Sequence, residues 1–503
     1  MSETIVLELP LATTPAQEHA LDVRFMAGKF LYNACLGESL NRLKRLRHSV
    51  EWKQARALPK SSEKAKAFRT CVQKYGFSNY DLQAFSTKTK NACWIGQHLD
   101  AHTTQKIASR AFAAAERYLY RKGGTPRFKR RFDTLGSLEG KSNASGIRWR
   151  TDHVEWGGLT LRGRFDPKDK HGVQTSALQQ VVKYCRIVKR TIKGRARYFV
   201  QLVLSGLPKQ KKKPGPGVVG LDLGPSSVAL VSSTTASLEV FCPGVAFPAE
   251  RLRRLQRALD RSRRANNPDN YRSDGTIKPG PKTWVVSAGY LRLRQAIAEC
   301  QRVLAARRIT EQGTLVNQVL SEGATIKTEK LTYTAFQKSF GRSVRDRAPG
   351  TFMTRLRHKA ESAGGKVVEF STRTTKLSQT CHCGNLAKKP LSQRWHQCAV
   401  CGAGPVQRDL YSAFLSLWVD PETETLDIRQ AQHAWPGAES LLLGTISRLE
   451  HESANGRVFP ASFGLKRQRR SGSAQEGALS ASRSKTCQSL GRAAESGTRT
   501  PRL

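Results

Sequence analysis

The fold is decided by the stretch Val218-Val219-Gly220-Leu221-Asp222-Leu223-Gly224. This stretch is typical of a buried strand that carries a single carboxylate, and the segment 225–231 after it predicts the return strand of a hairpin. Burying an ionised aspartate costs free energy unless a cation or hydrogen-bond donors compensate for it. Asp222 is therefore a candidate metal ligand, although a turn aspartate held by backbone amides would have the same local sequence.

Two further acids, Glu329 and Asp409, follow Asp222 in the sequence, and their order along the chain indicates the fold. Glu329 lies near the end of the strand-like run 324–331, after a helix predicted over 286–320, and on its own it is equally typical of an exposed surface residue. Asp409 opens an apolar helical stretch, where helix capping alone would explain it. Strand acid, strand acid and helix acid, with a hairpin after the first, form an RNase H-like arrangement. Such an arrangement brings three carboxylates to one end of a sheet.

Four of the eleven cysteines form a cluster in the sequence, namely Cys381, Cys383, Cys398 and Cys401. Two pairs are separated by 14 residues, and each pair is followed by a glycine. This spacing predicts a zinc ribbon, in which four thiolates hold one structural Zn²⁺. Because the first pair is C-x-C and not C-x-x-C, His382 or His396 is an alternative ligand, and a ribbon without metal is the competing interpretation.

The charge of the chain points to a polyanionic partner. The sequence holds 85 Lys and Arg against 39 Asp and Glu, a formal net charge of +46. We expect no membrane association, because no apolar run is long enough to span a bilayer and the start of the chain does not resemble a signal peptide. A cytoplasmic, nucleoid-associated protein that binds nucleic acid is the expectation, and a ribosomal or DNA-coating protein would share this charge.

The N-terminal half predicts strands that surround a helical insertion. The alternating residues 5–9 indicate a strand, and Thr14 begins a capping box that opens a mostly helical region reaching about residue 120. Strand-like segments between 145 and 204 predict a small β-barrel, whose first strand would be 5–9. Between them, a glycine-proline turn leads into a basic segment with one aromatic residue, a predicted contact for a nucleic-acid backbone: Arg127, Phe128, Lys129, Arg130 and Arg131.

The three acidic motifs resemble the RuvC nuclease motifs of the TnpB proteins of transposons and of the miniature type V CRISPR effectors. The matching features are the G-x-D-x-G strand at Asp222, the E-x-L segment at Glu329 and the R-D-x-x-x-A helix at Asp409. The resemblance extends to the segments 126–129 and 356–368 and covers roughly residues 5 to 420.

The resemblance implies an α+β multidomain fold. An oligonucleotide-binding-like β-barrel, or wedge domain, would hold an inserted helical recognition lobe, and an RNase H-like (RuvC) α/β nuclease domain with an inserted zinc ribbon would follow. The expected boundaries are 1–12 for the first barrel strand, 13–121 for the helical lobe, 122–207 for the rest of the barrel, 208–217 for a linker, 218–374 and 405–422 for the nuclease domain, 375–404 for the zinc ribbon and 423–503 for a low-complexity, disordered tail.

The resemblance also implies an activity. It predicts a Mg²⁺-dependent, RNA-guided endodeoxyribonuclease of antiviral defence or of a transposon, with guide RNA and double-stranded target DNA as partners and a short flanking motif in the DNA. Asp222, Glu329 and Asp409 would hold two catalytic Mg²⁺ ions, with Asp222 bridging them. So small a chain is expected to need a large RNA scaffold or a second copy, as in a homodimer.

Two positions depart from the family pattern. Relatives have asparagines in D-x-N-A-A-x-N, where this chain has Tyr411 and Leu415. A guided DNA-binding protein with weak or no cleavage is therefore an alternative. A DNA transposase or junction resolvase of the same fold is another, against which the cysteine cluster and the basic helical lobe argue.

Overall fold

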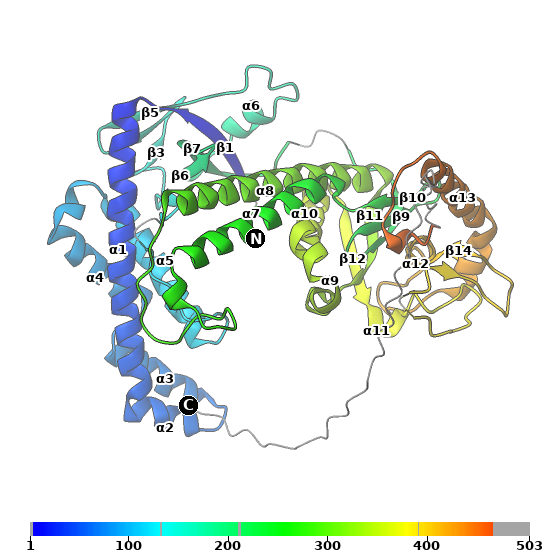
Figure 1. Ribbon diagram of the computed structural model, residues 1–503, viewed down its shortest axis with the longest axis horizontal. Coiled ribbons are helices and arrows are strands. Elements are labelled where there is room, and N and C mark those ends of the chain that lie inside the picture. Colours follow the sequence, from blue (N-terminus) through cyan, green and yellow to red (C-terminus); the bar gives the residue numbers. More distant parts are fainter. Residues whose placement is uncertain (1–3, 131–132, 210–212, 391, 466–503) are drawn as a thin grey trace, which may run out of the picture.

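The computed structural model describes residues 4–130, 133–209, 213–390 and 392–465. Figure 1 shows two halves: a left half with the long helix α1 (Pro15–His48) and one sheet at its top, and a right half built on a second sheet. This confirms the α+β class expected from the sequence. No helix of the described ranges has both the length and the apolar character needed to cross a membrane.

A curled seven-stranded sheet organises the N-terminal half, in the order β2-β6-β7-β1-β5-β4-β3. Its strands are β1 (Thr4–Ala12), β2 (Ser137–Glu139), β3 (Arg148–Trp149), β4 (His153–Trp156), β5 (Leu159–Gly163), β6 (Val182–Ile192) and β7 (Arg195–Ser205). The short helix α6 (Val173–Leu178) precedes β6. Strand β1 pairs antiparallel with both β7 and β5, so the chain leaves the sheet after its first strand and returns to it much later.

Strand β1 runs further than the sequence predicted. The alternating pattern indicated a strand over residues 5–9, whereas β1 continues through Pro10 to Ala12 and pairs with β5 there. Proline lacks an amide hydrogen, but its carbonyl group is unaffected. The Pro10 carbonyl accepts a hydrogen bond from the N–H of Arg164 at 2.7 Å, so the strand passes through the proline.

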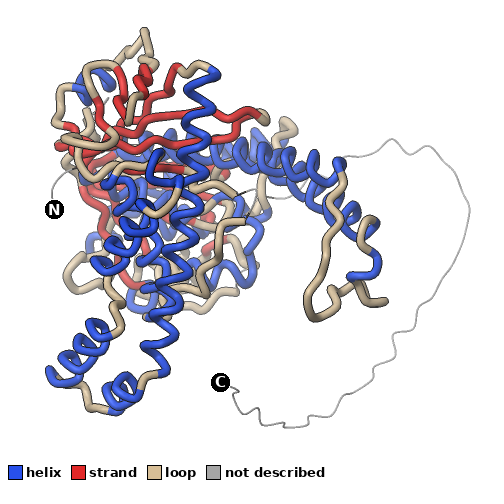
Figure 2. The backbone as a smooth tube through the Cα atoms, turned by 90° about the vertical axis from the view of Figure 1, so that its left-hand side faces the viewer, coloured by secondary structure: helices blue, strands red, loops and turns tan. Residues whose placement is uncertain are grey.

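Five helices fill the excursion between β1 and β2: α1 (Pro15–His48), α2 (Val50–Ala57), α3 (Ser62–Lys74), α4 (Asn79–Asn91) and α5 (Ala101–Leu119). The helix start at Thr14 is confirmed, because its side chain and that of Gln17 form the predicted capping box. Figure 2 shows the long α1, with α2 and α3 protruding as a pair at its far end. We call these five helices the helical lobe.

A five-stranded sheet organises the C-terminal half, in the order β10-β9-β8-β11-β12. Its strands are β8 (Gly217–Leu223), β9 (Ser227–Val231), β10 (Ala236–Val240), β11 (Gly323–Lys330) and β12 (Lys366–Ser371). Strands β8, β9 and β10 form an antiparallel meander, which confirms the predicted hairpin, whereas β11 and β12 are parallel to β8. The strands that carry Asp222 and Glu329, β8 and β11, therefore lie side by side within this sheet.

Helices connect and cover this sheet. They are α7 (Ala246–Ala265), α8 (Ala288–Glu322), α9 (Tyr333–Arg347), α10 (Pro349–Ser362), the one-turn α11 (Thr372–Thr375) and α12 (Arg408–Ser416). Helix α8 confirms the helix predicted over 286–320, and α12 packs on β8 and β9. The strand β13 (Trp395–His396), between the two cysteine pairs, and β14 (Val406–Gln407), directly before α12, form a small antiparallel ladder.

The prediction of a structureless tail from residue 423 is wrong for its first part. Residues Ile428–Ala454 form the 27-residue helix α13. Its buried side chains, among them Trp435, Leu442 and Leu449, join the same apolar core as Phe414 of α12. Burial of this apolar face stabilises a helix that the polar composition around it concealed. The rest of the predicted tail, 466–503, lies outside the described residues, as do 210–212 of the predicted linker.

Candidate active site and cysteine cluster

The three predicted acids are carried by three elements that meet at one end of the second sheet, where β8 and β11 end. Asp222 lies on β8, opposite Ala229 of β9. Thr328 of β11 pairs with Leu221, so the next residue, Glu329, lies beside Asp222. Helix α12 packs on β8 and carries Asp409 in its first turn. All three carboxylic side chains are half-buried, which leaves part of their surface accessible to solvent.

The electrostatic state of these acids reflects their crowding. Burial, followed by the negative charges of Asp409 and Glu329, raises the pKa of Asp222 well above its usual range. Burial also raises the pKa of Asp409 and of Glu329. Like charges in one place disfavour ionisation, and a cation relieves this penalty. The three side chains therefore form a mutually repelling acidic group that a bound cation would stabilise.

Asp409 does not cap its helix. The N-cap of α12 is Gln407, whose Oε1 accepts the N–H of Leu410 at 2.8 Å. Asp409 therefore has no capping bond of its own, and its Oδ2 instead accepts a hydrogen bond from Ser227 Oγ at 3.3 Å. Capping was the simpler explanation for this acid. Because Asp409 makes no capping bond, a role in the site beside β8 and β9 is favoured.

A glycine allows the helix to approach the sheet. A Cβ atom on Gly220 of β8 would lie 2.5 Å from Ser416 Oγ and still closer to the carbonyl oxygen of Ala413, both on α12. Real Cβ atoms do not approach other atoms so closely. Gly220 therefore sets the spacing between β8 and α12, and with it the separation of Asp222 from Asp409.

Several residues around the acids were not identified from the sequence. The positive charges of Arg408 and Arg394 counteract the raised pKa of Asp409, and Arg408 Nε lies 3.8 Å from Asp409 Oδ1. Thr375 Oγ1 donates to Glu329 Oε1 at 3.2 Å. Arg408 stands next to the third acid in the sequence, so adjacency could have identified it. Arg394 and Thr375 reach the site only through folding.

The four cysteines predicted as a cluster come together. Their Sγ atoms all lie within 4.8 Å of one another, with Cys381 and Cys401 at 3.6 Å and Cys383 and Cys398 at 3.7 Å. The shortened C-x-C pair therefore still presents both sulfur atoms. Four cysteine thiols in this arrangement can hold a metal ion such as zinc, which prefers tetrahedral sulfur ligands.

Neither alternative histidine is needed for this cluster. His382 Nε2 lies 3.9 Å from Cys401 Sγ, while its Nδ1 is 2.9 Å from the hydroxyl group of Tyr411. The ring of His396 stacks on that of Tyr411 at 3.9 Å, and its Nδ1 contacts Lys389 Nζ.

At Cys398, burial is outweighed by nearby backbone N–H groups, which lower its pKa to about 6. A thiolate is the form that binds metal.

Tyr411 links the cysteine cluster to the helix of the third acid. Its hydroxyl group accepts the backbone N–H of His382 at 2.8 Å and lies 3.3 Å from Cys381 Sγ. Both Tyr411 and Leu415 are fully buried in the apolar core. The two departures from the family pattern therefore face the core and the cysteines, and they replace none of the three carboxylates.

The predicted basic segment is fixed along α1. Lys129 donates its backbone N–H to Asn33 Oδ1 at 2.8 Å, and Asn33 Nδ2 returns a bond to the Lys129 carbonyl at 2.8 Å. The Phe128 ring lies against Gly37 of α1, while Arg127 and Arg130 are exposed. Arg131 lies outside the described residues. The segment thus presents basic side chains on an anchored backbone.

Comparison with known proteins gives a partial match. Residues 350–414 match the family model described as Cas12f1-like, TNB domain. This span contains all but the first residue of α10, the strand β12, the four cysteines and most of α12, with Asp409. The match confirms the resemblance to the miniature type V CRISPR effectors that the sequence motifs indicated.

Solved structures give distant similarities. One is described as the cryo-EM structure of the Cas12f1-sgRNA-target DNA complex, with 11% identity, a TM-score of 0.42 and coverage of 82% of this chain and 98% of that chain. Another is described as the cryo-EM structure of a CRISPR-Cas12f ternary complex, with 12% identity, a TM-score of 0.28 and coverage of 83% and 99%. No curated protein matches the sequence.

Proposed function

We propose that this protein is an RNA-guided DNA endonuclease. It binds a guide RNA, recognises a short motif beside a double-stranded DNA target and hydrolyses DNA phosphodiester bonds. The observation that carries the proposal is the meeting of Asp222, Glu329 and Asp409 at one end of the sheet, with pKa values raised by burial and, at Asp222, by the other two charges. The partial match to the Cas12f1-like family model supports the same proposal.

The topology of the second sheet supports an RNase H-like, RuvC-type domain. An antiparallel meander of three strands, followed by two strands parallel to the first, gives the order β10-β9-β8-β11-β12. In this domain the acid of the first strand, the acid of the fourth strand and the acid of a later helix share one end of the sheet. The curled N-terminal sheet is proposed as the wedge domain, and the helical lobe inserted after β1 as the recognition lobe.

We assign the binding of two Mg²⁺ ions to the three acids, because carboxylate oxygens are the hard ligands that Mg²⁺ prefers. Magnesium held there would supply activation of a water molecule and neutralisation of the charge that develops on the leaving oxygen. Asp222, between Glu329 on the next strand and Asp409 on α12, is the proposed bridging ligand. Arg394, whose charge already acts on Asp409, is available to attract the phosphate of a DNA strand.

The cysteine cluster is proposed to hold one structural Zn²⁺. The four cysteine sulfur atoms would fill all four coordination positions of the ion, which leaves no open position for catalysis. Tyr411 joins the cluster to α12 through the backbone N–H of His382. We therefore propose that the bound metal would hold α12 in place, and with it Asp409.

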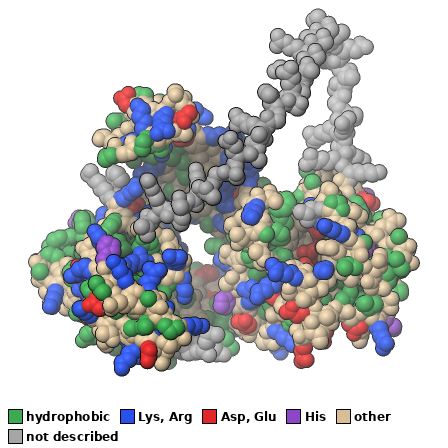
Figure 3. Space-filling view, turned by 90° about the horizontal axis from the view of Figure 1, so that it is seen from below, with side chains coloured by type: hydrophobic (Ala, Val, Ile, Leu, Met, Phe, Trp, Pro, Cys, Tyr) green, Lys and Arg blue, Asp and Glu red, His purple; other side chains and the backbone are tan. Residues whose placement is uncertain are grey.

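The charge distribution supports nucleic acid as the partner. Figure 3 shows the molecule hollowed between its two halves, with Lys and Arg side chains on the surfaces of both halves. A guide–target heteroduplex of about 20 base pairs carries about 40 phosphates, the same order as the net charge of this chain. The anchored segment with Arg127, Phe128, Lys129 and Arg130 is a proposed contact for the backbone of this duplex.

The burial of Tyr411 and Leu415 supports cleavage over passive binding. The binding-only alternative rests on these two departures from the family motif. Both side chains pack into the core and neither removes a carboxylate, so the acidic group is complete without the asparagines. A transposase or resolvase would also use the acids, but it has no need for a guide RNA.

The test is to purify the protein together with RNA from its own locus and to supply a plasmid library with randomised sequence beside the target. We expect Mg²⁺-dependent cutting of the plasmids that share one flanking motif, and loss of cutting for Asp222→Ala. Target binding without cutting by the unaltered protein would establish the binding-only alternative. Absence of associated RNA would refute guided recognition and favour the resolvase or transposase.

A further inference from the structure

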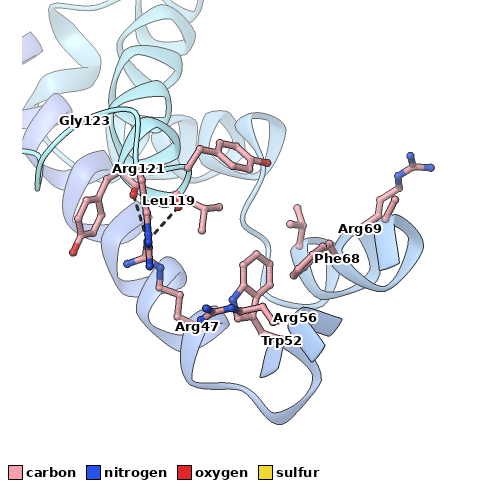
Figure 4. A pocket seen from close by; sticks show the side chains of 12 residues that line it. Arg47, Trp52, Arg56, Phe68, Arg69, Leu119, Arg121 and Gly123 are labelled. Carbon is pink, nitrogen blue, oxygen red and sulfur yellow. Dashed lines mark hydrogen bonds between the residues drawn. The ribbon is translucent and has the colours of Figure 1, made fainter. Parts of the chain in front are cut away.

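The far end of the helical lobe contains a cavity that the proposed nuclease chemistry does not use. The C-terminal turn of α1, helices α2 and α3, and the end of α5 enclose a volume of about 1050 Å³ (Figure 4). Its rim reaches Gly123, in the turn that precedes the basic segment 127–130. Its lining combines aromatic rings with arginines, and none of the described lining residues is acidic.

Aromatic side chains form one wall of this cavity. The rings of Trp52 on α2 and Phe68 on α3 lie 4.6 Å apart at an interplanar angle of 57°. Figure 4 shows the two rings beside each other, with Arg56 close to Trp52. Both rings are only half-buried, so part of their faces is open to the cavity. Partly exposed aromatic faces are the surfaces on which an unpaired base stacks.

Arginines surround the aromatic wall. Arg47 is held in place, because its guanidinium lies over the Tyr118 ring at 4.8 Å and donates to the Tyr118 carbonyl at 3.4 Å. Arg56, Arg69 and Arg121 are exposed, and no acidic side chain in the described part of the chain forms an ion pair with them. Such guanidinium groups attract phosphates, and each of them can also stack on a base.

We propose that this cavity binds an unpaired nucleobase of single-stranded nucleic acid, with the base on Trp52 and Phe68 and its flanking phosphates on Arg56, Arg69 and Arg121. The proposal deepens the proposed function and rests on it, because it requires that the helical lobe contacts nucleic acid. It adds a recognition element for bases that are not paired. A duplex presents no free base face, so the cavity selects single strands.

The path of the chain beyond the cavity supports this occupant. The rim residue Gly123 leads directly into the segment 127–130, which Asn33 anchors along α1. A nucleic-acid strand that leaves the cavity would therefore meet exposed Arg127 and Arg130 next. An apolar protein segment, including one from a second copy, would leave the charges of the arginines unmatched.

The test uses the full-length protein and short oligonucleotides that carry one 2-aminopurine, a fluorescent base whose emission falls when it stacks. Single-stranded RNA, single-stranded DNA and a duplex of the same sequence are compared. We expect quenching with the single strands but not with the duplex, and the RNA and DNA arms identify which strand is preferred. In the double variant Trp52→Leu with Phe68→Leu, quenching should disappear and single-strand affinity should fall about tenfold.

Two further variants keep the result interpretable. Tyr80→Leu, which removes an 81% exposed aromatic ring elsewhere in the same lobe, should leave quenching intact. Arg56→Gln with Arg69→Gln should reduce the slope of log affinity against log salt by about 1.4 for a single strand, since each lost phosphate contact contributes about 0.7. Circular dichroism of each variant establishes that the helices remain folded.

The proposal is overturned if quenching persists in the double variant, or if the duplex is quenched as strongly as the single strands. A change in sedimentation of the double variant at unchanged oligonucleotide affinity would also overturn it and would identify the cavity as a seat for a second copy. Guided plasmid cleavage by the unaltered protein is scored separately. Cleavage without Trp52-dependent quenching refutes the cavity alone, whereas quenching without associated RNA or cleavage refutes the guided nuclease alone.

Discussion

Replacing Gly220 by alanine should separate the acids of the proposed active site. The added methyl group would lie 2.5 Å from Ser416 Oγ and closer still to the carbonyl oxygen of Ala413. Carbon atoms pack comfortably at about 3.5 Å, so α12 must withdraw from β8 by about 1 Å or more. The obstacle includes helix backbone, which cannot rotate away as a long side chain can. The displacement is therefore transmitted to Asp409 at the start of the same helix.

The size of the effect follows from this displacement. Overpacking of a well-packed core costs about 1–3 kcal/mol of unfolding free energy. A misplacement of about 1 Å in a catalytic site costs about 100-fold in rate. We therefore expect Gly220→Ala to lower the stability of the C-terminal half moderately, and to lower the cleavage rate by about two orders of magnitude, with RNA binding retained.

The assay is single-turnover cleavage of a guide-matched DNA, together with thermal denaturation of the same preparation. Gly313→Ala is the matched control: it lies within α8, a Cβ there would meet no atom within 4 Å, and alanine favours a helix. We expect Gly313→Ala to cleave normally and to be at least as stable. If Gly220→Ala cleaves DNA at the unaltered rate, the close approach of α12 does not position Asp409 and the reasoning is wrong.

Three further outcomes are expected. Burial, followed by the charges of Asp409 and Glu329, raises the pKa of Asp222 above its usual 3.8. The folded protein therefore loses stability as pH rises toward the raised pKa, because the unfolded chain ionises Asp222 at a lower pH than the folded state does. Asp222→Asn should therefore raise the thermal midpoint without added Mg²⁺ increasingly with pH; a gain that shrinks as pH rises would contradict this. Elemental analysis should find one Zn²⁺ per unaltered chain and a loss of it in Cys398→Ser, whereas Cys93→Ser, at an exposed position, should retain the metal; an unaltered chain without zinc would contradict the assignment. Tyr411→Phe should cost about 1–3 kcal/mol in denaturant titration by leaving the His382 N–H unpaired, and unchanged stability would refute that link.

Local sequence patterns predicted the local structure well. The apolar run around Asp222 and the return segment after Gly224 identify β8 and β9, because a hairpin is specified by neighbouring residues. Thr14 and Gln17 identify the start of α1 for the same reason. The cysteine cluster was predictable because thiol ligands occur in closely spaced pairs and the structure does bring all four together.

What the sequence did not predict depends on distant contacts. Helix α13 contains Pro436 and many polar residues, and its apolar face is recognisable only once α12 provides a surface to cover. The role of Gly220 likewise requires the position of α12. The short ladder of β13 and β14 brings Arg394 close to Asp409. The sequence around either residue does not show this pairing.

The departures at Tyr411 and Leu415 illustrate the same limit. In the motif, Tyr411 and Leu415 stand where relatives have asparagines beside the third acid, and this difference argued for weak or absent cleavage. In the folded chain both side chains turn toward the core, and the Tyr411 hydroxyl group meets the cysteine cluster. Motif spacing gives the residue type at a position, whereas the face of the helix decides what that residue does.

The most direct measurement is cleavage of a guide-matched DNA by three conservative variants, Asp222→Asn, Glu329→Gln and Asp409→Asn, with target binding measured in parallel. Asp427→Asn provides the control, because it makes the same chemical change at the N-cap of α13, where asparagine also caps well. We predict that each of the three variants binds RNA and target but does not cut, while Asp427→Asn cuts normally. Undiminished cutting by any of the three would contradict the assignment of the active site.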